Sequence, residues 1–118
     1  MSDNVILNKS KEFAVRIIKL YQYLEKRDRR FDITNQVLRS GTSIGANVRE
    51  ALQGQSTADF IAKMSIALKE ACETEYWLEL LYETNYLKED EYTSMQKDCE
   101  ELIKMLVCII RTSKENHN

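Results

Sequence analysis

Apolar residues recur every three or four positions along most of the chain, which is the spacing of one face of an α-helix. The pattern predicts four helices, over residues of about 8–29, 32–53, 57–84 and 89–113, with polar joints between them. Short connections make neighbouring helices antiparallel. We therefore expect an all-α fold, an up-down-up-down four-helix bundle that forms a single domain over residues 1–118.

The first and fourth predicted helices each carry a second line of apolar residues. These lines are Ala14, Ile18 and Tyr21 in the first helix and Ile103, Val107 and Ile110 in the fourth. A four-helix bundle buries one stripe per helix, so the surplus apolar surface favours self-association. The alternative is a thick monomeric core.

Small residues occupy the middle of the second predicted helix, from Ser40 to Ala46. Each glycine in a helix interior costs about 1 kcal/mol, which would favour a break. The apolar period keeps its phase across the patch, however, and this favours a continuous helix with Gly41 and Gly45 one turn apart.

A turn centred on Gly54-Gln55 sets the register between the second and third predicted helices. In that register Arg39 faces Glu70, which predicts a partly buried ion pair. The same register places large apolar residues opposite the two glycines: Met64 opposite Gly45, and Leu68 opposite Gly41.

Composition agrees with long helices. The chain has no proline and only three glycines, too few for the many turns of an all-β fold. Its longest apolar run, Met105 to Ile110, is far shorter than the roughly 20 residues of a membrane span. No secretory signal is visible at the N-terminus, so we expect a cytoplasmic protein without a membrane partner. Three cysteines without a CxxC pair fit buried thiols in a reducing compartment: Cys72, Cys99 and Cys108.

Few residues are suited to catalysis or metal binding. The only histidine is His117, the penultimate residue, which removes most histidine-dependent chemistry. The stretch from Gly41 to Ala46 lacks the strand and the lysine of a phosphate loop. The third predicted helix is rich in glutamate, but a di-metal site also needs histidines, so Glu73 and Glu79 are expected on a solvated face. We expect no enzyme activity, no cofactor and no metal.

Two residues near the C-terminus have the spacing of a nuclease pair. Arg111 and His117 are separated by five residues, about the spacing seen in a class of helical ribonucleases. The pair must converge on one phosphate from an ordered helix, whereas residues 114–118 read as a polar tail. A ribonuclease is therefore the weakest of the alternatives.

Charge is distributed unevenly along the chain. Residues 1–49 carry ten Lys/Arg and five Asp/Glu, and residues 50–118 carry seven and fourteen. On the first helix, five cations and one aromatic ring fall within an arc of about 100°, together with Glu12. The predicted nucleic-acid-binding residues are Arg16, Lys19, Tyr23, Lys26, Arg27 and Arg30. Such a face offers charge for phosphates and a ring for an unpaired base, although a plain solvated face would look the same.

Two segments resemble a known family. The run LRSGTSIGANVREA, from Leu38 to Ala51, is similar to the signature of the 23S ribosomal-RNA intervening-sequence proteins, also called four helix bundle proteins. The run ALKEACETEYWL, from Ala67 to Leu78, resembles the third helix of that family. The resemblance covers residues of about 8–113, and Lys88 departs from it where a capping serine is expected. The signature residues are Arg39, Ser40, Gly41, Thr42, Ser43, Gly45, Asn47, Glu50 and Glu70.

The resemblance implies an antiparallel bundle, a ring-like homopentamer and no enzyme activity. The family name refers to the position of some of its genes within inserts in ribosomal-RNA genes. A related bundle is an accessory factor of the reverse transcriptase of diversity-generating retroelements and engages nucleic acid through a basic surface. The leading hypothesis is therefore a homo-oligomer that binds structured RNA, possible targets including ribosomal RNA. The alternative is a protein-interaction scaffold or accessory factor for a nucleic-acid enzyme. On either hypothesis, the signature residues serve the fold or an interface.

Overall fold

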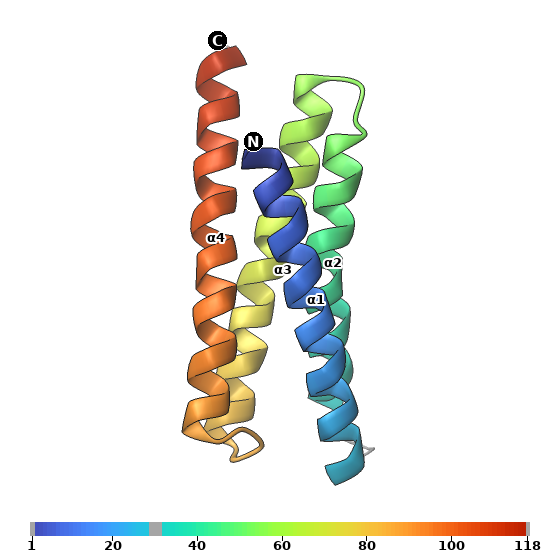
Figure 1. Ribbon diagram of the computed structural model, residues 1–118, viewed down its shortest axis with the longest axis vertical. Helices are drawn as coiled ribbons and strands as arrows, with labels where there is room; N and C mark the ends of the chain where they lie inside the picture. The colour runs from blue at the N-terminus through green and yellow to red at the C-terminus, as the bar shows by residue number, and fades with distance from the viewer. Residues whose placement is uncertain (1, 29–31, 118) are drawn as a thin grey trace.

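Four helices make up nearly all of the described chain: α1 (Ser2–Arg27), α2 (Asp32–Leu52), α3 (Thr57–Glu83) and α4 (Glu89–His117). The computed structural model describes the backbone of residues 2–28 and 32–117 and the side chains of residues 5–28 and 32–116. No residue in these ranges lies in a strand. Successive helices run in opposite directions and form a bundle about 49 Å long (Figure 1). The all-α bundle predicted from the apolar period is confirmed.

Two helices are longer than predicted. α1 begins at Ser2 and not near Asn8, and Ser10 is buried inside the helix. The Ser10 hydroxyl donates to the carbonyl of Leu7 at 3.2 Å. α4 continues to His117, so the predicted polar tail is helical as far as residue 117. The apolar period marks only the part of a helix that packs, and these polar ends lie beyond it.

The core runs along the whole bundle axis and receives side chains from every helix. α1 and α4 approach each other less closely than the other neighbouring pairs, and in Figure 1 they diverge toward the α3–α4 loop. The largest fully buried side chains are Phe13, Ile6, Ile17, Leu24, Ile44, Met64, Leu78, Leu81, Leu102, Leu106, Val37 and Val48. Within the described ranges, no helix is long and apolar enough to cross a membrane.

The two glycines of α2 face α1, which corrects the predicted neighbours. A Cβ atom on Gly41 would lie 2.7 Å from Cγ1 of Ile17, and one on Gly45 would lie 3.3 Å from the carbonyl oxygen of Ser10. The predictions that Leu68 and Met64 cover these glycines are therefore wrong. α2 packs against α1 on one side and α3 on the other, and a register across one turn does not say which side a residue occupies.

The register between α2 and α3 is nevertheless correct. Arg39 Nη1 donates to Glu70 Oε2 at 3.2 Å, as predicted. Deeper in the same interface the Thr74 hydroxyl donates to Ser40 Oγ at 2.8 Å, and both side chains are fully buried. This polar contact and the ion pair between Arg39 and Glu70 fix the alignment of α2 and α3 along the bundle axis.

Local capping sets both ends of the α3–α4 loop. At the end of α3, Asn85 has a φ of 68°, and the N–H of Tyr86 donates to the Leu81 carbonyl at 2.8 Å, which is a Schellman motif. α4 then begins at Glu89 although Lys88 replaces the expected serine. The Glu91 carboxylate accepts the backbone N–H of Lys88 at 2.8 Å and so supplies half of a capping box.

Candidate nucleic-acid interface

The outer face of α1 brings together three of the six predicted nucleic-acid-binding residues. Lys19 and Lys26 are exposed, and the Tyr23 side chain between them is 41% exposed. Neither lysine forms an ion pair with a residue that the structure describes. The two lysines are seven residues apart, so their backbones lie about 10 Å apart along the helix on nearly the same side. We call Lys19, Tyr23 and Lys26 the outer α1 face.

Arg16 and Arg27 lie at the edge of this face and are engaged within the bundle. Arg16 forms an ion pair with Asp98, and its Nη2 donates to Ser94 Oγ at 2.8 Å. Its charge is thus partly neutralised by α4. These contacts bridge α1 and α4, the neighbouring helix pair that packs least closely.

Arg27 holds the end of α1 against the α3–α4 loop. Its Nη1 donates to the carbonyl of Tyr86 at 2.6 Å, and the guanidinium lies 5.0 Å from the centroid of the Tyr86 ring. Both groups are uncharged, so these contacts do not compensate the positive charge of Arg27 beside the outer α1 face. Arg30, the sixth predicted residue, lies outside the described residues.

The signature residues of α2 make contacts inside the bundle. Ser40 bonds Thr74 in the core, and the glycines allow α1 to approach, as described above. The hydroxyls of Thr42 and Ser43 donate to carbonyls one turn earlier in the helix, at 2.7 and 2.6 Å. Asn47 donates to the Ser43 carbonyl at 2.8 Å. These polar groups are satisfied by α2 itself.

The charged signature residues link α2 to α3. Arg39 pairs with Glu70 and also with Glu73, and Glu50 pairs with Lys63 at 3.1 Å. Glu73 also accepts a hydrogen bond from Trp77 Nε1 at 3.1 Å. The prediction that Glu73 lies on a solvated face is wrong, because it is half-buried between these partners. Its position three residues after Glu70, on the same helix face, was the available signal.

Neither a metal site nor the arrangement of the helical ribonucleases is apparent among the described residues. No group of three or more His, Cys, Asp and Glu side chains there is placed to hold a metal ion. Positions 111 and 117 are six residues apart in a continuous helix and therefore about 120° apart around its axis. Helical order alone does not bring them to one face of α4.

Two cysteine thiols, Cys72 and Cys99, have raised pKa values, which disfavours nucleophilic chemistry at both. Burial raises the pKa of the Cys99 thiol to about 12, and Glu75 adds to this effect. Its Sγ lies 3.3 Å from the Ala71 carbonyl, to which the thiol donates. Burial also raises the pKa of Cys72, again with a contribution from Glu75. Cys99 is buried as predicted, whereas Cys72 and Cys108 are exposed, which corrects that prediction for both.

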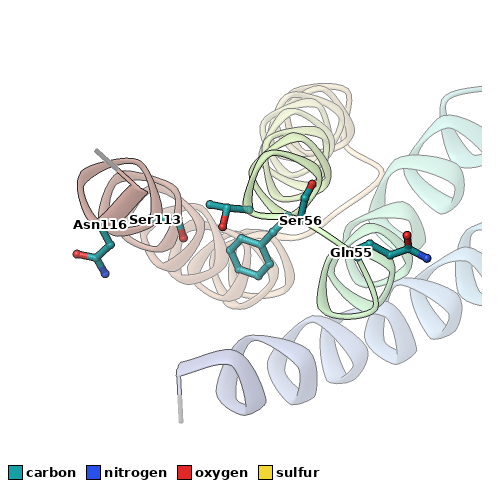
Figure 2. Close-up of a pocket in the computed structure, with 7 residues that line it drawn as sticks. Gln55, Ser56, Ser113 and Asn116 are labelled. Atoms are coloured by element: carbon teal, nitrogen blue, oxygen red, sulfur yellow. The ribbon is translucent and has the colours of Figure 1, made fainter.

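A polar pocket of about 600 Å³ opens at one end of the bundle, between the α2–α3 turn and the end of α4. Figure 2 shows Gln55 and Ser56 on one side and Ser113 and Asn116 on the other. None of the described side chains that line this pocket is titratable, so they offer neither a general acid nor a general base.

Comparison with known proteins agrees with the fold. A family model described as 23S rRNA-intervening sequence protein matches residues 2–108. A crystal structure from Bacteroides thetaiotaomicron, of a protein of unknown function in the S23 ribosomal protein family, shares 57% sequence identity with this chain. The match covers 94% of this chain and 99% of that one, with a TM-score of 0.91. A comparison with curated proteins finds no match. The chain therefore belongs to the 23S rRNA-intervening sequence protein family.

Proposed function

We propose that this member of the 23S rRNA-intervening sequence protein family is a non-catalytic, homo-oligomeric bundle that binds structured RNA through the outer α1 face. The observation that carries the proposal is the exposure of Lys19 and Lys26, free of acidic partners in the described chain, on either side of an exposed tyrosine ring. Lysine heads attract phosphates, and the ring of Tyr23 offers a stacking surface to an unpaired base.

The rest of the molecule restricts where RNA can bind. Residues 50–118 are strongly acidic in balance, so they repel a polyanion. Arg27 adds a third cation beside the outer α1 face because its partners are neutral carbonyl oxygens and a ring. Arg16 contributes less because Asp98 already compensates its charge.

Exposed apolar side chains support self-association. Ile18 of α1 is 42% exposed and Val107 of α4 is 36% exposed, and both belong to the predicted second apolar lines. Val15 adds a further exposed apolar side chain near Ile18. A ring-like homopentamer, as the family resemblance implies, would cover such surfaces.

The RNA assignment is tested with a fluorescein-labelled RNA hairpin that carries an unpaired loop, titrated with protein at several salt concentrations. The variant replaces Lys19 and Lys26 by Glu, and the control replaces Lys69 and Lys104 by Glu. The control lysines are also exposed and unpaired in the described chain, on α3 and α4, and the change in net charge is the same.

We expect the variant to lose at least about tenfold in affinity, while the control stays close to the wild type. The slope of log affinity against log salt should fall by about two in the variant, because two phosphate contacts are lost. Equal losses in variant and control would refute the outer α1 face, and a wild type that does not bind would refute RNA binding.

Self-association is measured separately by light scattering after size-exclusion chromatography. We expect a mass several times that of one 13.8 kDa chain. A mass of one chain at micromolar concentration would refute the oligomer and would leave the RNA measurement unaffected.

A further inference from the structure

A second surface, between α1 and α2, has the features of a docking groove. It has a volume of about 320 Å³ and is lined by Leu7, Lys11, Ala14, Thr42, Gly45, Ala46 and Arg49. Gly45 contributes no side chain to it and packs against the α1 backbone at Ser10. Ala14 and Ala46 add only methyl groups, so an aliphatic surface remains between the two helices.

Positive charge is the one polar feature of the groove that no described partner compensates. Lys11 and Arg49 are exposed, one on each helix, and neither forms an ion pair with a described residue. The Thr42 hydroxyl, in contrast, already donates to the Leu38 carbonyl at 2.7 Å. The groove therefore combines an aliphatic floor with two cations that no described side chain compensates.

This combination fits a protein segment better than RNA. None of the described residues that line the groove is aromatic, so they offer a nucleobase no stacking partner. Ala14 lies five residues before Lys19 and hence about 140° from it around α1, so the groove floor faces away from the outer α1 face. Aliphatic side chains bury well on such a floor, and neighbouring carboxylates would meet the cations.

We propose that the α1–α2 groove docks an acidic amphipathic segment of a partner protein. An aliphatic side chain of that segment lies over Gly45 and Ala46, and acidic residues beside it pair with Lys11 and Arg49. This interaction is separate from the proposed RNA binding and does not depend on it.

The test is selection of short peptides from a random peptide display library on the wild-type protein. Two variants change the groove, Ala46→Glu and Lys11→Glu. Two matched controls, Ala62→Glu and Lys104→Glu, introduce the same changes at exposed positions of α3 and α4. Circular dichroism verifies that all four variants remain folded, which is expected because every substituted side chain is exposed.

We expect the selected peptides to place Asp or Glu next to Leu, Ile, Val or Met. They should bind the wild type and both controls equally, and each groove variant at least about tenfold more weakly. Selected peptides without acidic enrichment, or with equal affinity for the groove variants, would overturn the proposal.

Two further measurements distinguish a protein segment from two other occupants of the groove, RNA and a second copy of this chain. A fall in hairpin RNA affinity in Ala46→Glu, with no fall in Ala62→Glu, would assign the groove to RNA and overturn the proposal. Dissociation of an oligomer by Ala46→Glu alone would assign it to a second copy of this chain and would also overturn it.

Discussion

Replacing Gly41 by alanine tests how closely α1 and α2 pack. The added Cβ would lie 2.7 Å from Cγ1, 2.8 Å from Cγ2 and 3.0 Å from Cδ1 of Ile17, and that side chain is fully buried. Real Cβ atoms essentially never approach other atoms below 3.0 Å. Rotation about χ1 gives little relief, because both branches of the isoleucine are too close and β-branched side chains are stiff. The two helices must therefore shift apart.

Two opposing terms set the size of the effect. Overpacking in a well-filled core costs about 1–3 kcal/mol, and contacts of 2.7 and 2.8 Å place this site in the upper part of that range, at about 2–3 kcal/mol. Alanine is the better helix former and recovers about 1 kcal/mol relative to glycine. We expect Gly41→Ala to lower the free energy of unfolding by about 1–2 kcal/mol.

A double-mutant cycle with Ile17→Ala isolates the contact. Ile17→Ala alone should cost about 2–5 kcal/mol because it leaves a cavity. In that background Gly41→Ala no longer meets the isoleucine branches and should stabilise the fold by about 1 kcal/mol. The cycle should therefore give a coupling energy of about 2–3 kcal/mol between the two positions.

The assay is urea unfolding followed by far-ultraviolet circular dichroism. All four proteins are compared at one protomer concentration, since any self-association makes stability concentration-dependent. A Gly41→Ala protein as stable as the wild type, or a coupling energy near zero, would show that α1 and α2 are not in contact at Ile17.

Three other changes probe separate parts of the bundle. Gly45→Leu should destabilise the fold by about 3 kcal/mol in the same assay, since the neighbour at Ser10 is backbone that does not rotate away, and a loss below about 0.5 kcal/mol would contradict this packing. Asn85→Val should cost about 1–2 kcal/mol because Asn85 has a positive φ, whereas Asn85→Gly should cost nothing, and equal effects would exclude the left-handed cap. The pKa of the Cys99 thiol is about 12 in the fold, against an ordinary value of 9.0 in the unfolded chain. The raised pKa makes its full contribution to the free energy of unfolding below pH 9, and this contribution is lost as the pH rises toward 12. The wild type should therefore lose more stability between pH 8 and pH 10 than Cys99→Ala, and parallel losses would show that Cys99 does not contribute.

Much of this fold could be predicted because its elements follow local rules. The apolar period located all four helices, and the joint at Gly54-Gln55 placed Arg39 opposite Glu70, as the structure confirms. The helix ends were less predictable. α1 and α4 extend through polar residues that do not pack, and a period of buried positions contains no information about them.

The orientation of α2 was not predictable from the same pattern. Each helix of the bundle has two neighbours. The length of a turn constrains the register only between the two helices that the turn connects. The turn therefore predicts that Gly41 and Gly45 face α3, whereas they face α1. Spacing identifies residues that share a stripe, but the choice between two adjacent helices depends on the shape of the assembled core.

The placement of the signature residues also bears on function. The Thr42, Ser43 and Asn47 side chains bond their own helix, and Arg39 bonds glutamates of α3. A resemblance carried by these residues is therefore a statement about how α2 packs, because their polar groups are already in use. The α1–α2 groove is lined in part by Thr42 and Gly45 of the signature, whereas the outer α1 face contains no signature residue. Two proteins of this fold can thus share the whole signature and bind different partners, so the Lys19 and Lys26 substitutions are the more informative test of function.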